Sequence, residues 1–359
     1  MTAPLRVGLD ITPLVGPPTG IYQHTRHLAH ALAERDDIEV SGWLLSARGA
    51  MPDFPGATRR APVPAAVAAR VWRHLAWPGR RTLAGGVDVV HGTNFLGPPA
   101  PTTVLTIQDL TPLHQPERVE PAVAAKGPAI RRAIDRGAWV HVSSERVRDE
   151  LQQEVATDRV RVVHHALPDP IPTEPGTGRR LVGRDRYVVV VGTTEKRKRP
   201  ERVVAAMAAI DPSVALAVVG PAGNAEPVLD QAIRRHGLAD RVVRLVGLDD
   251  HDRTAVVADA AALALASDYE GFGLTPLEAL RAGVPVAATA VGALPELIGA
   301  DVALASPDGS DFTEHLAAAL DEVVPDDVAH RLGDLTWQRH AAQMTDLYAL
   351  AAGSSVDEP

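Results

Sequence analysis

The chain has 359 residues, 45% hydrophobic and 23% charged, with a formal net charge of -9 and no cysteine. Its length predicts two domains with separate cores, and the lack of any run of 18 apolar residues argues against a membrane-spanning helix. The absence of thiols excludes disulfides, thiolate zinc sites, iron–sulfur ligation and a cysteine nucleophile, and the acidic balance argues against a general nucleic-acid binder. With no signal-like leader at Met1, we expect a cytoplasmic protein.

The first part of the chain is predicted to form an α/β domain with a parallel sheet. An apolar strand at Leu5–Asp10 runs into a glycine- and proline-rich loop at Thr12–Gly20, and Ile21–Arg35 has helical spacing. Further buried strands are predicted at Val40–Leu45, Val87–His91, Thr103–Gln108 and Trp139–Val142. We therefore expect a first Rossmann-like domain over residues 1–172.

A second domain of the same design is predicted over residues 181–330. Pro172–Arg180 is rich in proline, glycine and charge, and we interpret it as the linker between the domains. Buried parallel strands are predicted at Tyr187–Gly192, Ala215–Gly220, Val242–Gly247, Ala262–Ala266 and Pro285–Thr289. The tail at residues 336–350 is predicted to be a last amphipathic helix.

The most informative segment is Ser267–Gly283, SDYEGFGLTPLEALRAG, which follows a predicted buried strand. Glu270 lies at the carboxyl end of that strand, where open α/β sheets bind ligands, and the glycines beside Phe272 allow the backbone to approach a ligand closely. Glu278 has two interpretations at this stage. It is either a ligand-binding carboxylate or the capping-box glutamate of a helix that begins at Thr275.

The second segment is Val191–Pro200, VGTTEKRKRP, where a predicted strand ends in a glycine and four basic residues precede a helix. Two of the three lysines of the chain, Lys196 and Lys198, lie here. Cations beside a helix N-terminus stabilise a double negative charge such as a diphosphate. The alternative is a solvated basic loop.

Together these segments resemble the retaining family-4 glycosyltransferases of the GT-B fold, which have two facing Rossmann-like domains and a C-terminal helix that crosses back to the first. The most specific match is EGFGLTPLEALRAGVPVAATAVGALPELIG at Glu270–Gly299, and GTTEKRKRPERVVAAM at Gly192–Met207 is similar to the diphosphate loop of the family. In the first domain the resemblance rests on Val87–Pro99, Thr103–Glu117 and Val140–Leu151.

The resemblance implies a role for each matching residue. Glu278 corresponds to the carboxylate that holds the nucleotide ribose, Glu270 to the one that faces the donor sugar, and Lys198 to the diphosphate lysine with Arg197 as its neighbour. The implied catalytic residues are Glu270, Lys198, Arg197, Asp109 and His91. The implied donor-binding residues are Gly20, Thr193, Lys198, Glu270, Gly271, Phe272, Gly273, Leu274 and Glu278. The resemblance implies no metal and no cofactor besides the nucleotide-sugar substrate.

Two positions depart from the family pattern. Thr193 replaces an arginine that many members carry after the strand glycine, so Arg197 or Arg199 would have to supply the second cation. Gln108 replaces the histidine that commonly precedes the aspartate, which weakens or alters the implied catalytic site. His91 could partly substitute for it together with Asn94, or each could be a satisfied strand-end residue.

The sequence thus predicts a retaining glycosyltransferase that moves a hexose of the mannose or glucose type from a nucleoside diphosphate sugar to a hydroxyl acceptor. The acceptor is expected to be a saccharide, a lipid-linked saccharide or a small molecule, and no nucleic acid is expected as a partner. The alternatives are a catalytically weakened sugar-nucleotide-binding protein, which Gln108 favours, and a phosphorylase or epimerase on the same fold. Dinucleotide, P-loop, HExxH and nucleophile-elbow motifs are absent.

One further segment, Ala65–Arg81, is cationic and carries Trp72, Leu75 and Trp77. A basic amphipathic stretch of this kind can lie on an anionic membrane surface. The alternative is an ordinary helix that packs its tryptophans inward.

Overall fold

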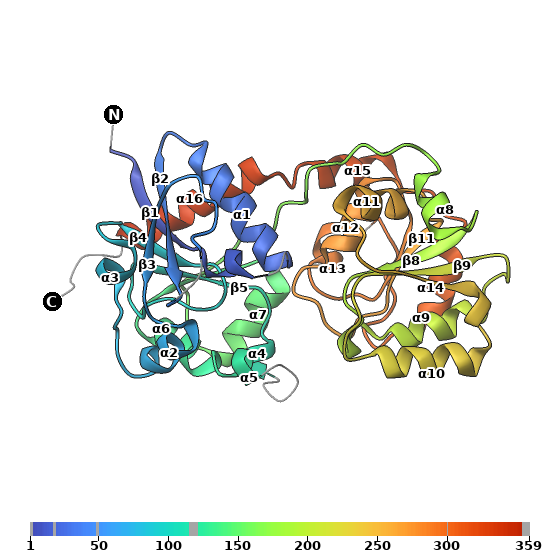
Figure 1. Ribbon diagram of the computed structural model, residues 1–359, viewed down its shortest axis with the longest axis horizontal. Coiled ribbons are helices and arrows are strands. Elements are labelled where there is room, and N and C mark those ends of the chain that lie inside the picture. Colours follow the sequence, from blue (N-terminus) through green and yellow to red (C-terminus); the bar gives the residue numbers. More distant parts are fainter. Residues whose placement is uncertain (1–2, 17–18, 48–49, 115–120, 300, 354–359) are drawn as a thin grey trace. The chain divides into compact units, whose positions relative to one another are not determined.

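The computed structural model describes residues 3–16, 19–47, 50–114, 121–299 and 301–353, which divide into two compact α/β units (Figure 1). The first unit comprises Met1–Ala166 and Thr336–Pro359, and the second comprises Leu167–Leu335. Parts of three sequence predictions lie outside the described residues: positions 17–18 of the first loop, 115–117 of one resemblance segment and 300 of the second unit.

The first unit is built on a seven-stranded parallel sheet with the order β3-β2-β1-β4-β5-β6-β7. Its strands are β1 (Leu5–Asp10), β2 (Ile38–Leu45), β3 (Ala57–Ala61), β4 (Val89–Gly92), β5 (Thr103–Ile107), β6 (Trp139–Val142) and β7 (Val160–Val162). The apolar runs predict five of these strands. They do not predict β3 and β7, because these two edge strands, ATRRA and VRV, carry arginines and are short of apolar residues.

Helices from both ends of the chain complete the first unit. They are η1 (Thr12–Val15), α1 (Gly20–Ala33), α2 (Ala65–Trp72), α3 (Arg80–Ala84), α4 (Thr111–His114), α5 (Pro121–Ala124), α6 (Gly127–Asp135), α7 (Glu145–Glu154) and α16 (Trp337–Gly353). The last helix, α16, packs against α1, and Leu28 and Leu32 share one core with Met344 and Leu347. This apolar seam explains why the end of the chain belongs to the first unit.

The second unit has a five-stranded parallel sheet with the order β10-β9-β8-β11-β12. Its strands are β8 (Tyr187–Val191), β9 (Ala215–Val219), β10 (Val242–Leu245), β11 (Ala262–Leu265) and β12 (Val286–Ala288). Its helices are α8 (Thr177–Val182), η3 (Lys196–Lys198), α9 (Pro200–Met207), α10 (Glu226–His236), η4 (Ala239–Arg241), α11 (Asp250–Ala258), α12 (Leu274–Arg281), α13 (Leu294–Ile298), α14 (Phe312–Ala319) and α15 (Asp326–Gly333). The predicted α/β class is confirmed in both units.

The interpretation of Pro172–Arg180 as an interdomain linker needs correction, because this stretch belongs to the second unit. The Asp259 carboxylate accepts backbone hydrogen bonds from Gly176 and Gly178, at 3.0 and 2.8 Å, and so fixes the start of α8. Gly176 has φ +84°, and a Cβ at Gly178 would lie 2.3 Å from the carbonyl oxygen of Ala255, so glycine is needed at both positions of this helix start. The chain passes between the units at 166–167 and 335–336, where the N–H of Leu167 donates to the carbonyl of Leu335 at 2.8 Å.

Candidate functional site

The strand order of the second sheet has a topological switch between β8 and β11, since the chain winds outward from this pair in both directions. In open parallel sheets, the crevice beyond the carboxyl ends of such a strand pair is where ligands bind. The loop after β8 carries Lys198 and Arg197, and the loop after β11 carries Glu270. Two segments about 70 residues apart in the sequence are thus brought together at one edge of the sheet.

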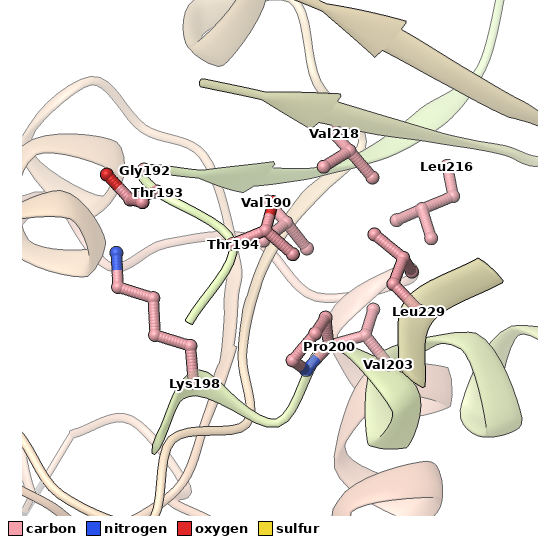
Figure 2. Close-up of a pocket in the computed structure, with 10 residues that line it drawn as sticks. All are labelled: Val190, Gly192, Thr193, Thr194, Lys198, Pro200, Val203, Leu216, Val218 and Leu229. Atoms are coloured by element: carbon pink, nitrogen blue, oxygen red, sulfur yellow. The ribbon is translucent and has the colours of Figure 1, made fainter. Parts of the chain in front are cut away.

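Lys198 reaches back from η3 to the end of β8, and Figure 2 shows its ammonium group beside Gly192 and Thr193. A Cβ at Gly192 would lie 2.3 Å from Lys198 Nζ, and Gly192 has φ +114°. The left-handed φ requires glycine at this strand end, and the short distance shows how closely the ammonium group approaches the backbone. Burial lowers the pKa of Lys198, and the nearby Glu270 carboxylate opposes that effect.

A pocket begins at the Lys198 side chain and runs between the sheet and helices α9 and α10 (Figure 2). It is lined by Val190, Gly192, Thr193, Thr194, Lys198, Pro200, Val203, Leu216, Val218 and Leu229. Its inner wall is apolar, so the polar atoms gather at the end that holds Lys198 and the two threonines. The polar end is the part that suits a charged ligand.

Arg197 and Glu270 form an ion pair that joins the two loops, with Arg197 Nη1 2.7 Å from Glu270 Oε2. The other Glu270 oxygen accepts a hydrogen bond from Ser267 Oγ at 2.9 Å, and Arg197 Nε lies 2.8 Å from a Glu195 oxygen. Ser267 is completely buried, and its carbonyl accepts a bond from Thr289 Oγ1 at 2.6 Å. Glu270 is therefore held in place from the core side and neutralised from the loop side.

Arg199, the other candidate for a second cation, is turned toward acidic side chains. Its Nε lies 2.6 Å from Asp268, and its Nη1 lies 3.3 Å from Glu201. Arg202 holds the second oxygen of Asp268 at 2.8 Å. Arg199 thus ties the β11 loop to the start of α9, and Arg197 is the arginine that accompanies the Glu270 carboxylate.

The helix after Glu270 starts at Leu274, earlier than its capping pattern predicts. The residue before it, Gly273, has φ +97°, and no side chain caps the helix. Glycine adopts this left-handed conformation without a steric penalty, which overrides the Thr-Pro start signal. Glu278 consequently lies beyond the first turn, and the capping-box interpretation of Glu278 is wrong.

Glu278 instead pairs with Arg253 of helix α11, whose Nη1 lies 2.9 Å from Glu278 Oε2. Both side chains are partly buried, with 16% of Glu278 and 26% of Arg253 exposed. The arginine fixes the orientation of the carboxylate. The sequence does not indicate a role for Arg253. Its pairing with Glu278 depends on the fold, which brings α11 beside α12.

In the first unit the corresponding switch lies between β1 and β4. Asp10, at the end of β1, is buried, and burial raises its pKa to about 6. Lys126 interacts electrostatically with Asp10 and with Asp109, and its Nζ lies 3.3 Å from Asn94 Oδ1. Sequence reasoning missed Asp10 and Lys126, although the strand-end rule that selects Glu270 also selects Asp10.

Gly20 is the first residue of α1 and is exposed. A Cβ placed there would meet no atom within 4 Å. The backbone at Gly20, at the end of the loop that follows β1, is therefore accessible. A glycine that approaches a ligand needs such access.

His91 needs correction as a catalytic candidate, because it is completely buried and both of its ring nitrogens are engaged. Nδ1 lies 2.8 Å from the Tyr348 hydroxyl, and Nε2 lies 2.7 Å from Thr106 Oγ1. Thr106 Oγ1 also lies 2.9 Å from Nδ1 of His141, whose Nε2 faces the carbonyl of Val163 at 2.9 Å. His91 is thus a satisfied strand-end residue, which is the second of its two predicted interpretations.

The Ala65–Arg81 segment packs one of its two tryptophans inward and exposes the other. Trp72 at the end of α2 is completely buried, and its Nε1 donates to the carbonyl of Pro78 at 3.1 Å. Leu75 and Trp77 are exposed by 61% and 57%. Among the helices that the structure describes, none has both the length and the apolar character that a membrane crossing needs.

Comparison with known protein families gives a match within the second unit. Residues 179–334, which contain Lys198, Glu270 and Glu278, match the model of the family described as glycosyl transferases group 1. The resemblance stated from the sequence is confirmed at this level.

Relatives and solved structures extend the match over most of the chain. An MMP alpha-(1->4)-mannosyltransferase of Mycolicibacterium hassiacum is 29% identical over 328 residues, which cover 81% of this chain and 76% of that protein. A sucrose-phosphate synthase from Thermosynechococcus elongatus superposes with a TM-score of 0.73 at 20% identity, covering 96% of this chain and 98% of that one. WaaG, a glycosyltransferase involved in lipopolysaccharide biosynthesis, gives 0.68 at 19% identity, with 96% and 97% covered. The fold is GT-B.

Proposed function

We propose that this glycosyltransferase moves a hexose, of the mannose or glucose type, from a nucleoside diphosphate to a hydroxyl acceptor with retention of anomeric configuration, as family-4 enzymes do. The observation that carries the proposal is the convergence of Lys198 and the Arg197–Glu270 pair at the switch between β8 and β11. A diphosphate needs fixed cations, and a neutral sugar needs hydrogen-bonding carboxylates; this edge of the sheet supplies both.

Each charged group has a role that follows from its surroundings. Lys198 and Arg197 stabilise the diphosphate as it leaves, together with the N–H groups of the first turn of α12, which have no partner within the helix. Glu270, fixed by Ser267, accepts hydrogen bonds from the sugar hydroxyls. Glu278, oriented by Arg253, accepts those of the ribose.

The transfer is a same-face displacement in which charge develops on the leaving group. The bond between the anomeric carbon and the diphosphate oxygen breaks, and its electron pair goes to that oxygen. The acceptor hydroxyl forms the new bond to the anomeric carbon, and its proton passes to the departing diphosphate. Glu270 forms no covalent bond in this scheme, because its two oxygens are occupied by Arg197 and Ser267.

The first unit is proposed to bind the acceptor. Asp10, Asn94, Lys126 and Asp109 line the carboxyl edge of its sheet with groups that hydrogen-bond hydroxyls. Gly20 is proposed to approach the diphosphate from this unit. A saccharide, a lipid-linked saccharide or a small hydroxyl compound fits this chemistry.

A lipid-linked acceptor would place the protein at a membrane surface, and the exposed Leu75 and Trp77 beside arginines of the same segment favour that contact. Sedimentation with anionic vesicles tests it. Binding that weakens when Leu75 and Trp77 are both changed to serine supports the contact, and unchanged binding contradicts it.

The second candidate is a protein that binds a sugar nucleotide without turning it over. Gln108 favours it, because its Oε1 is engaged by His165 Nε2 at 2.6 Å in place of the family histidine. Incubation with radiolabelled GDP-mannose and UDP-glucose separates the two candidates. Transfer or slow donor hydrolysis supports the enzyme, and tight binding without either supports the second candidate.

The base and the stereochemistry need their own measurements. A thermal-shift screen with GDP, UDP and ADP identifies the base, since a ligand that binds the native state raises its melting temperature. Proton NMR of the first product formed reads the anomeric configuration. An inverted product contradicts the retaining mechanism, and a requirement for inorganic phosphate indicates a phosphorylase.

A further inference from the structure

Three buried histidines meet inside the first unit, and we name them the histidine cluster: His24 on α1, His165 after β7 and His340 on α16. Their exposed fractions are 6%, 5% and 1%. The ring centroids of His24 lie 4.6 Å from those of His165 and 5.2 Å from those of His340. None of the three has a part in the proposed transfer reaction.

The cluster leaves ring nitrogens without hydrogen-bond partners. Both nitrogens of His24 and Nε2 of His340 are buried and have no partner among the described residues. A buried polar atom without a partner is costly, and in native proteins it usually marks a ligand, an ion or a water. Three apolar side chains would pack in this position without that cost.

The surrounding hydrogen bonds fix where the lone pairs point. His340 Nδ1 lies 2.8 Å from the carbonyl of His164, which can only accept, so Nδ1 carries the proton and Nε2 the lone pair. His165 Nε2 lies 2.6 Å from Gln108 Oε1, which leaves the lone pair on Nδ1. Metal-binding histidines are oriented in this way, with the second nitrogen donating to a carbonyl oxygen.

The protonation state is also the one that a metal requires. Burial lowers the pKa of His24 and His165 well below the usual value and that of His340 to about 4. All three imidazoles are therefore neutral at pH 7, and each offers a lone pair.

A fourth histidine in the same region shows the contrast. The ring centroid of His141 lies 5.6 to 6.2 Å from those of the cluster, yet both of its nitrogens are satisfied by Thr106 and the Val163 carbonyl. Burial alone thus does not leave a histidine of this unit without partners. In the cluster, by contrast, one ring nitrogen of each histidine lies within 4.8 Å of a ring nitrogen of the other two.

We propose that His24, His165 and His340 bind one divalent transition-metal ion of the zinc class, with water as the fourth ligand. One ligand atom from each residue lies within 4.8 Å of the other two. Zinc–nitrogen bonds are about 2.0–2.1 Å long, so each ring needs to move by less than about 1 Å to close the site. A set of imidazoles without thiolate or carboxylate suits zinc, copper and nickel rather than magnesium or calcium. The site departs from the sequence-based expectation that the chain binds no metal.

The position of the cluster indicates a structural role. His165 is the residue before Ala166, where the first unit ends, and His340 lies four residues after the chain re-enters that unit at Thr336. The ion would fasten both segments to α1, the helix that begins with Gly20. It would thus fix the first unit at the two points where the chain passes to and from the second.

The experiment uses the full chain, purified without a histidine tag and stripped with a chelator. Elemental analysis and calorimetric titration with Zn²⁺ should give one ion per chain, with a raised melting temperature. Co²⁺ should give the visible absorption of a tetrahedral site. A wild-type protein that binds no Zn²⁺ or Co²⁺ overturns the proposal and indicates a buried water in its place.

Variants locate the ion. His24→Phe and His340→Phe keep an aromatic ring and should each lose the bound ion, whereas His30→Ala, an exposed position on the same helix, should keep it. Gln108→Ala removes the group that orients His165 and should weaken zinc binding about 10- to 100-fold. His251→Ala should leave the stoichiometry unchanged, because Asp249, His251 and Asp252 form a second group of possible ligands among the described residues, at the surface of the other unit. Loss of the ion in His251→Ala, or its retention in His24→Phe, contradicts the assignment.

Discussion

The two sheets of this protein have the same topology around their switch points but different chemistry there. Beside β8 and β11 the second unit places Lys198 near arginines and carboxylates that form partly exposed ion pairs, such as Arg197–Glu270. Beside β1 and β4 the first unit places buried polar side chains, such as His91 and Asp10, and burial raises the pKa of the Asp10 carboxyl.

The difference shows that the fold supplies the crevice and the loops supply the chemistry. Fixed cations cost little where water still reaches them, and they stabilise a developing anion strongly once a substrate excludes that water. Buried hydrogen-bonding groups instead suit the recognition of hydroxyls and the packing of α1 against α16. The predictions below test this division of roles, beginning with the second unit.

The largest effect is expected for Lys198→Ala. Its ammonium group lies at the polar end of the pocket beside Gly192, and loss of one preorganised charge contact lowers a rate by about 10²- to 10³-fold. Lys196→Ala is the matched control, since Lys196 is exposed on the same short helix. Steady-state turnover with the donor measures both. Equal activity of a folded Lys198→Ala variant and the wild type contradicts the role of Lys198.

Variants of Glu278 and Glu270 should affect different steps, the first nucleotide binding and the second sugar transfer. Glu278→Gln should weaken nucleoside diphosphate binding about 10- to 100-fold, because a hydrogen bond to a charged group contributes about 1.5–3 kcal/mol. Glu270→Gln should leave nucleotide affinity nearly unchanged and lower transfer instead. Isothermal titration with the free nucleotide and turnover assays of both variants provide the measurements. The reverse pattern would exchange the two assignments.

A smaller effect is expected from Asp10 in the first unit. Burial raises the pKa of its carboxyl from 3.8 to about 6, so ionisation destabilises the folded state. Below about pH 4 the group is protonated in both states and carries no penalty, whereas above about pH 6 it is ionised in both and the penalty is complete. Stability therefore falls across this window as the pH rises.

Asp10→Asn removes the charge and keeps an oxygen for the N–H of Thr12. It should stabilise the protein by about 3 kcal/mol at pH 8, since each pKa unit corresponds to about 1.4 kcal/mol, and by much less at pH 4. Urea unfolding at the two pH values measures the difference. A gain of the same size at both would show that the carboxyl is not strained by burial.

The comparison of the units also explains what the sequence could predict. The signals in the loops after β8 and β11 are local. After β8 a glycine and a basic run follow the strand, and after β11 a polar run and two glycines follow it, so Lys198 and Glu270 are candidates from the sequence alone. The start of α12 is predicted less well, because the left-handed Gly273 overrides the Thr-Pro signal. No local sequence pattern predicts that Arg253 pairs with Glu278, because this ion pair depends on the packing of α11 beside Glu278.

The first unit is harder to interpret because its functional candidates come from distant segments. Lys126 lies near Asp10 and Asn94, and the three residues belong to three separate parts of the chain. The histidine cluster joins positions 24, 165 and 340. His91 illustrates the opposite error: a polar strand-end residue suggests catalysis from sequence, but burial and two hydrogen bonds account for it.

The last prediction links the two units, and its effect on stability and binding should be the smallest. Gly20 is exposed and has space around it, so Gly20→Trp should change the free energy of unfolding by less than about 0.5 kcal/mol. If Gly20 approaches the diphosphate when the units close on the donor, the indole should obstruct closure and lower transfer, while nucleotide affinity falls less than about tenfold.

Small-angle scattering with and without the nucleoside diphosphate tests the closure directly, and Gly20→Ala is the matched control. We expect such a movement to occur about the two chain crossings, whose residues Leu167 and Leu335 are joined by a hydrogen bond. The wild type and Gly20→Ala should become more compact on binding, and Gly20→Trp should not. If the radius of gyration of the wild type is unchanged and Gly20→Trp transfers sugar at the full rate, the first unit does not reach the diphosphate through Gly20. The charged edge of the second unit would then hold the donor alone.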